Sequence, residues 1–109
     1  MPSGEVKSST VRLDGEQSIR TIAEAFDRLR REFKDNDAVV IDAADVSEVD
    51  LSFVQLLESA RKTASLEGRR LRLASPASGP LRAVLERGGF LNQAHSDAAA
   101  FWLGSPGEL

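Results

Sequence analysis

The most specific chemistry in this chain is indicated by a serine that follows an acidic segment and opens an apolar, helix-like stretch. Residues 45–52 read DVSEVDLS, and the apolar periodicity continues from Phe53. Ser52 is therefore expected at the start of a helix. A phosphoserine brings about −1.5 to −2 charges, which the free N–H groups and positive dipole end of a helix N-terminus tolerate. The pattern indicates a reversible phosphorylation site at Ser52.

Ser52 also has a purely structural interpretation. Together with Gln55 it forms an S-x-x-Q capping box, in which each side chain satisfies a backbone N–H group at the helix start. Loss of such a cap costs on the order of 1 kcal/mol. Local sequence alone favours the capping interpretation. It does not exclude the switching hypothesis, so both stay open.

Charge is unevenly distributed along the chain. Residues 1–58 carry seven basic and thirteen acidic side chains, whereas residues 59–109 carry seven basic and four acidic ones. Between Asp35 and Glu58 there are seven acids and no base. A phosphate at Ser52 would deepen this negative charge, and a docking partner would meet a changed surface without any refolding. A solvated acidic loop explains the same charges without a partner.

Other reactive side chains give weaker signals. The carboxylates of Asp42, Asp45 and Asp50 are of the kind that Mg²⁺ prefers, but each position also suits a turn or a cap, and we expect no metal site. His95 is the single histidine. No nucleophile and acid pattern surrounds it, so we interpret it as a surface or loop residue. We accordingly expect no catalytic residue, no cofactor and no enzymatic activity.

The densest basic cluster consists of Arg69, Arg70 and Arg72. The chain is acidic overall, with a net charge of −3, and it contains no recognition-helix pattern. The cluster therefore does not predict nucleic-acid binding.

The elements that must position Ser52 follow from the spacing of apolar residues. Ser52 lies between a short β-branched run and a stretch whose apolar residues recur every three or four positions. The expected strands are residues 8–13, 38–41 and 71–74, and the expected helices are residues 18–34, 52–66 and 81–85 with a C-terminal helical tail over about 95–104. The tail either packs Phe101 or Trp102 on the body or exposes them as an interface pair.

Strand–helix alternation over 109 residues predicts a small α/β fold, residues 1–109 forming a single domain with at least one parallel strand pair. The absence of cysteine excludes disulfides. No apolar run approaches the roughly 20 residues that span a bilayer, so membrane insertion is not expected. The polar first residues lack the apolar core of a signal peptide, which favours a cytoplasmic location.

The ordered pattern of the chain resembles the STAS domain family, named after sulphate transporters and anti-sigma factor antagonists. The residues that carry the resemblance are the segment 45–52, the helix with Leu56-Leu57, Gly68, Leu71-x-Leu73, and the final segment Leu85-x-x-Gly88-Gly89-Phe90. The resemblance extends over about residues 8–92. It implies a mixed β-sheet with helices packed mainly on one face.

The resemblance also implies a mechanism. In the antagonist branch, a serine kinase that doubles as the anti-sigma factor phosphorylates a serine in an Asp-Ser-Ser-Gly-like turn and thereby breaks the complex. Ser52 falls on the phosphorylated position, Asp50 on the preceding aspartate, and Asp45 on the aspartate at the strand end. Leu51 replaces the first serine and Phe53 replaces the glycine. The bulky Phe53 either blocks a kinase pocket or is itself a binding anchor.

These observations predict a non-enzymatic interaction and signalling module that is switched at Ser52. The expected partner is a serine kinase or anti-sigma factor, or another ATPase-fold protein, and a homodimer is compatible with the pattern. The expected partner-binding residues are Asp45, Glu48, Asp50, Leu51 and Phe53. The alternative is a constitutive accessory subunit that docks, without phosphorylation, on the ATPase of a lipid transporter or on a chemotaxis-type signalling protein.

Overall fold

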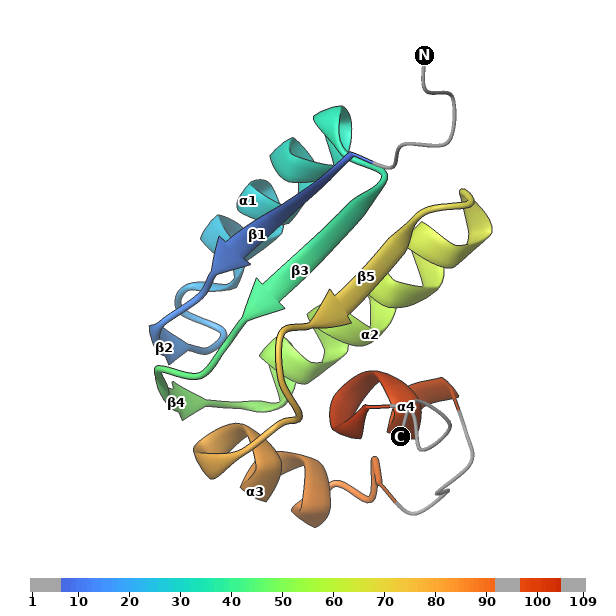
Figure 1. The fold of residues 1–109 in the computed structure, drawn as a ribbon. Coiled ribbons are helices and arrows are strands. Elements are labelled where there is room, and N and C mark those ends of the chain that lie inside the picture. The colour runs from blue at the N-terminus through green and yellow to red at the C-terminus, as the bar shows by residue number, and fades with distance from the viewer. Residues whose placement is uncertain (1–6, 92–96, 105–109) are drawn as a thin grey trace.

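The computed structural model describes residues 7–91 and 97–104. Strands and helices alternate along most of the chain (Figure 1). In chain order they are β1 (Ser8–Arg12), β2 (Gly15–Gln17), α1 (Ile22–Asp35), β3 (Ala38–Asp42), β4 (Val46–Val49), α2 (Leu51–Leu66), β5 (Arg70–Leu73), α3 (Gly79–Arg87) and α4 (Asp97–Leu103). The α/β fold class predicted from the sequence is confirmed.

The strands form two small sheets, one of three strands in the order β1-β3-β5 and one pairing β2 with β4. Every pairing in the described part of the chain is parallel. The mixed sheet that the family resemblance implied is therefore not found within residues 8–73. The reason is connectivity, because helix α1 or α2 separates the paired strands along the chain and returns it to the same end of the sheet.

One face of the three-stranded sheet forms the core. Val39 is paired with Leu71 and Ile41 with Leu73, and all four side chains are buried. Helices α1 and α2 both lie behind the sheet in Figure 1, which agrees with the expectation that helices pack mainly on one face. The opposite face carries Ser8, Thr10, Ala38 and Val40 together with the arginines of β5.

Helix α2 ends where the sequence predicted. Gly68 has a positive φ of 73°, and the Arg69 amide donates a hydrogen bond to the Ala64 carbonyl at 2.7 Å. A glycine just past the last turn reaches this left-handed conformation without a side-chain clash. The turn directs the chain into β5.

The C-terminal tail is part of the core. Phe101 and Trp102 pack edge to face with ring centroids 4.8 Å apart, and Trp102 is completely buried. The Trp102 indole N–H donates to Glu58 Oε2 on α2 at 2.7 Å. The interpretation of this pair as packing is confirmed, and its alternative as an exposed interface pair is wrong. His95 and the first two residues of the expected tail lie outside the described residues.

Candidate functional site

The candidate site is built around the N-terminus of α2, and its central residue is Asp50. Asp50 has extended backbone angles, and its Oδ1 accepts a hydrogen bond from the Ser52 backbone N–H at 3.0 Å. Asp50 is therefore the N-cap and Ser52 is the second helical residue. The capping box predicted for Ser52 and Gln55 is wrong. Aspartate caps a helix as well as serine does, and here it lies one residue before the helix begins.

The Ser52 hydroxyl is half-buried and donates to Asp50 Oδ1 at 2.5 Å. The other carboxylate oxygen of Asp50 accepts a hydrogen bond from the Ile19 backbone N–H at 2.9 Å. One carboxylate thus ties the start of α2 to the turn that precedes α1. The Ser52 hydroxyl, followed by the Ile19 amide, lowers the pKa of Asp50 below its ordinary value. Asp50 is therefore ionised at neutral pH.

Two exposed apolar side chains flank this hydrogen-bonded cluster. Ile19 is 67% exposed and Leu51 is 47% exposed. Ile19 falls within the helix expected over residues 18–34, but α1 begins only at Ile22. Pairing of Gln17 with Val49 in the β2–β4 sheet brings the Ile19 turn beside α2. No local sequence signal indicated this neighbour.

The acidic side chains expected at the site are on the surface. Glu48 and Asp45 are both exposed. Asp45 forms an ion pair with Arg12, which offsets part of its charge. Glu48 lies opposite Glu16 in the β2–β4 pair. Glu16 therefore lies beside Glu48, and Arg20 offsets part of its charge through an ion pair at 3.5 Å. Strand pairing brings these two carboxylates together, so the local sequence did not indicate their proximity.

Phe53 does not belong to this surface. Its side chain is completely buried, with Val54 and Leu57 of the same helix in the core. Residues one turn apart share a helix face, and the Phe53 and Leu57 face points into the domain. Phe53 can neither contact a partner on the folded domain nor obstruct a pocket from outside, so the prediction that it binds a partner is wrong.

The arrangement can present an ionised carboxylate, a hydroxyl and two apolar side chains to another protein. We name this set, Ile19, Asp50, Leu51 and Ser52, the α2-start face. In the part of the chain that the structure describes, no three or more His, Cys, Asp or Glu side chains are grouped so that they could hold a metal ion. In residues 7–91 and 97–104 no helix is long and apolar enough to cross a membrane.

Comparison with known proteins identifies the family. The family model described as "Mlab, STAS domain" matches residues 2–92, so the chain belongs to the STAS domain family. It is similar to the solved structure described as "Crystal Structure Analysis of Mglu", with 19% identity and a TM-score of 0.56. That similarity covers 63% of this chain and only 17% of the other, and it concerns the fold alone. No curated protein matches.

Membership of the STAS family has a direct consequence at the level of function. STAS domains are protein-interaction modules. The chain is therefore a small interaction module with a STAS fold.

Proposed function

We propose that the domain is an anti-sigma factor antagonist-like signalling module that binds a partner through the α2-start face and is switched by phosphorylation of Ser52. The observation that carries the proposal is the hydrogen-bonded link from Ser52 through Asp50 to Ile19, which lies beneath two exposed apolar side chains. The proposed partner is a serine kinase or another ATPase-fold protein. The module itself performs no catalysis, and its location is cytoplasmic.

The link explains how a phosphate would act. Phosphorylation replaces the Ser52 hydroxyl proton, so the bond to Asp50 is lost. It also places about −1.5 to −2 charges next to the ionised Asp50. Two unit charges about 4 Å apart interact by about 1 kcal/mol in water and about 4 kcal/mol at an effective dielectric constant of 20. The helix N-terminus offsets part of this repulsion.

The expected result is a changed docking face on an intact fold. Repulsion pushes the Asp50 carboxylate away from Ser52 and weakens its hold on the Ile19 amide. The partner then meets extra negative charge and a displaced apolar side chain together. Both changes oppose a complex that forms on the unmodified face.

The alternative function is constitutive docking on the ATPase of a lipid transporter or on a chemotaxis-type protein. One observation favours it. Ser52 already has a structural role, because its hydroxyl donates to the N-cap of its own helix. A serine held in this way stabilises a permanent docking surface without ever being modified.

Incubation with the cognate serine kinase and ATP, followed by mass spectrometry, separates the two functions. Phosphate on Ser52 that disappears in Ser52→Ala supports the switch. Ser59→Ala is the matched control, since Ser59 is an exposed serine on the same helix. An unmodified Ser52 in a complex that still assembles would instead support constitutive docking.

A further inference from the structure

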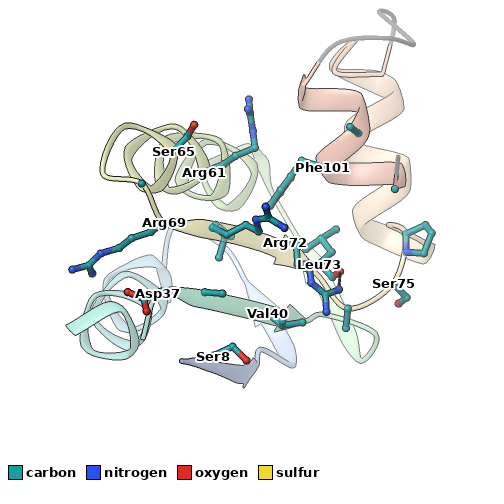
Figure 2. Close-up of a pocket in the computed structure, with 18 residues that line it drawn as sticks. Ser8, Asp37, Val40, Arg61, Ser65, Arg69, Arg72, Leu73, Ser75 and Phe101 are labelled. Carbon is teal, nitrogen blue, oxygen red and sulfur yellow. Dashed lines mark hydrogen bonds between the residues drawn. The ribbon is translucent and has the colours of Figure 1, made fainter. Parts of the chain in front are cut away.

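A long groove lies beside β5, across the open face of the three-stranded sheet and the outer edge of that strand. It has a volume of about 1390 Å³, and nine consecutive residues, 68–76, line it. Ser8, Ala38 and Val40 line it on the side of β1 and β3, and residues of α2 and α4 line the other side. Figure 2 shows Arg61, Arg72 and Phe101 around it. None of the residues that line it belongs to the α2-start face.

On the side that faces this groove β5 has no strand partner among the described residues, and the Leu73 carbonyl accepts a hydrogen bond from Arg72 Nη1 at 3.4 Å. Among the described strands β5 has a neighbour on one side only, which is β3. The Arg70 amide donates to the Asp37 carbonyl at 3.0 Å and the Ala74 amide donates to the Ile41 carbonyl at 2.8 Å. Since backbone groups of a strand alternate in direction, the amides of Leu71 and Leu73 point outward. No described residue accepts a hydrogen bond from either of them.

The groove is also strongly basic. It is lined by four arginines, and Asp37 is the one acid among the lining residues. Arg61 is paired with Glu58, and Arg69 donates to the Phe33 carbonyl. Arg70 and Arg72 are exposed, and neither forms an ion pair with any residue that the structure describes. Along β5, Arg70 and Arg72 alternate with Leu71 and Leu73, the two residues whose amides point outward.

From this geometry we propose that the β5 edge binds an extended acidic segment of a partner protein by strand addition. An added strand supplies backbone groups at the spacing that the Leu71 and Leu73 amides require. Acidic side chains at alternate positions of that strand lie next to Arg70 and Arg72. Neither a nucleic acid nor a lipid headgroup offers such a repeating backbone partner, so a peptide is the occupant that the edge selects.

A second copy of β5 does not fit this edge. Pairing two β5 strands would place arginines of one copy beside arginines of the other, and like charges on neighbouring strands are destabilising. Edge arginines also protect a sheet against aggregation. Protection against aggregation requires only the charge of the arginines. Strand addition requires the free amides of Leu71 and Leu73 as well, so the two roles can be distinguished by following these amides.

The test uses a labelled peptide of about eight alternating glutamate and valine residues. Fluorescence anisotropy measures its affinity, and NMR hydrogen exchange follows the Leu71 and Leu73 amides. We expect saturable binding that protects both amides. The double variant Arg70→Glu/Arg72→Glu should weaken binding by about tenfold or more. The matched control Arg31→Glu/Arg87→Glu changes net charge equally at exposed arginines outside the groove and should leave the affinity unchanged.

The decisive comparison is a glutamate–valine peptide whose alternate backbone amides are methylated. It keeps its charge but cannot form a strand, so we expect it to bind about tenfold or more weakly. Equal binding of the methylated peptide, or failure of the unmethylated peptide to bind, would overturn the proposal. Equally strong competition by duplex DNA or by phosphatidylglycerol vesicles would overturn it too, because the groove would then recognise negative charge alone.

Discussion

At the scale of single residues, the docking face depends on Asp50. Its carboxylate accepts hydrogen bonds from the Ser52 amide, the Ser52 hydroxyl and the Ile19 amide. The same side chain therefore starts a helix, orients a hydroxyl and holds an apolar neighbour in place. Any change of charge at Ser52 acts first on this carboxylate.

Replacement of Asp50 tests that role. Asp50→Ala removes the N-cap and should reduce the free energy of unfolding by about 1 kcal/mol, within a range of about 0.5–2. Asp50→Asn keeps a capping oxygen, so its free energy of unfolding should fall by less than that of Asp50→Ala. Urea unfolding followed by Trp102 fluorescence measures both. An alanine variant as stable as the parent would show that the observed bonds contribute nothing to the fold.

The charge of Asp50 predicts a pH dependence. The pKa of folded Asp50 lies below the ordinary 3.8, so its ionised form stabilises the fold above pH 3.8. That contribution is lost as the pH falls through the lowered folded pKa. Unfolding measured from pH 5 down to pH 2 should show a smaller acid-induced loss of stability in Asp50→Asn than in the parent. Identical dependence of stability on pH in Asp50→Asn and in the parent would contradict a lowered pKa of Asp50 in the folded state.

Phe53 and Leu51 are two residues apart but occupy opposite environments. Phe53→Ala empties core volume and should cost about 3–5 kcal/mol of unfolding free energy. Leu51→Ala alters an exposed side chain and should change stability by less than about 0.5 kcal/mol. Chemical denaturation of both variants provides the comparison. Similar costs at the two positions would mean that Phe53 is not a core residue.

At the scale of elements, the apolar pattern predicted α2, β3 and β5 well, because each buries a regular set of side chains. It placed the start of α1 four residues too early, at residue 18 instead of Ile22. It missed β2 and β4, which have three and four residues and show little alternation. Their pairing is what brings Ile19 beside the start of α2, so the part of Ile19 in the site could not be predicted, whereas Leu51 was expected there. The burial of Phe53 agrees with the apolar periodicity that begins at this residue, and its expected partner role came from comparison with the family turn.

The hydrogen bond between α2 and α4 depends on one carboxylate, that of Glu58. Glu58 accepts the Trp102 indole N–H and pairs with Arg61 at 2.6 Å. Glu58→Ala leaves a buried donor without a partner, so we expect a cost of about 1–3 kcal/mol. Glu86→Ala is the control, since its pair with Arg82 is exposed and worth about 0.3–0.5 kcal/mol. Equal melting temperatures for the two variants would argue against the contact.

At the scale of the whole molecule, two separate surfaces differ in charge. The α2-start face follows the acidic segment before α2, and the basic groove lies along β5. Because the two surfaces share no residue, occupation of one should leave the other unchanged. A titration of the glutamate–valine peptide against the domain, alone and saturated with its kinase or ATPase partner, should give equal affinities.

The most direct test of the central claim is the affinity of that partner for the unmodified domain and for the domain phosphorylated on Ser52. Calorimetry on the two forms provides the comparison, with circular dichroism to show that both are folded. The phosphorylated form should bind about tenfold or more weakly, because one modification removes the Asp50 bond and adds negative charge. Equal affinity of the two folded forms would contradict the claim that Ser52 controls the docking face.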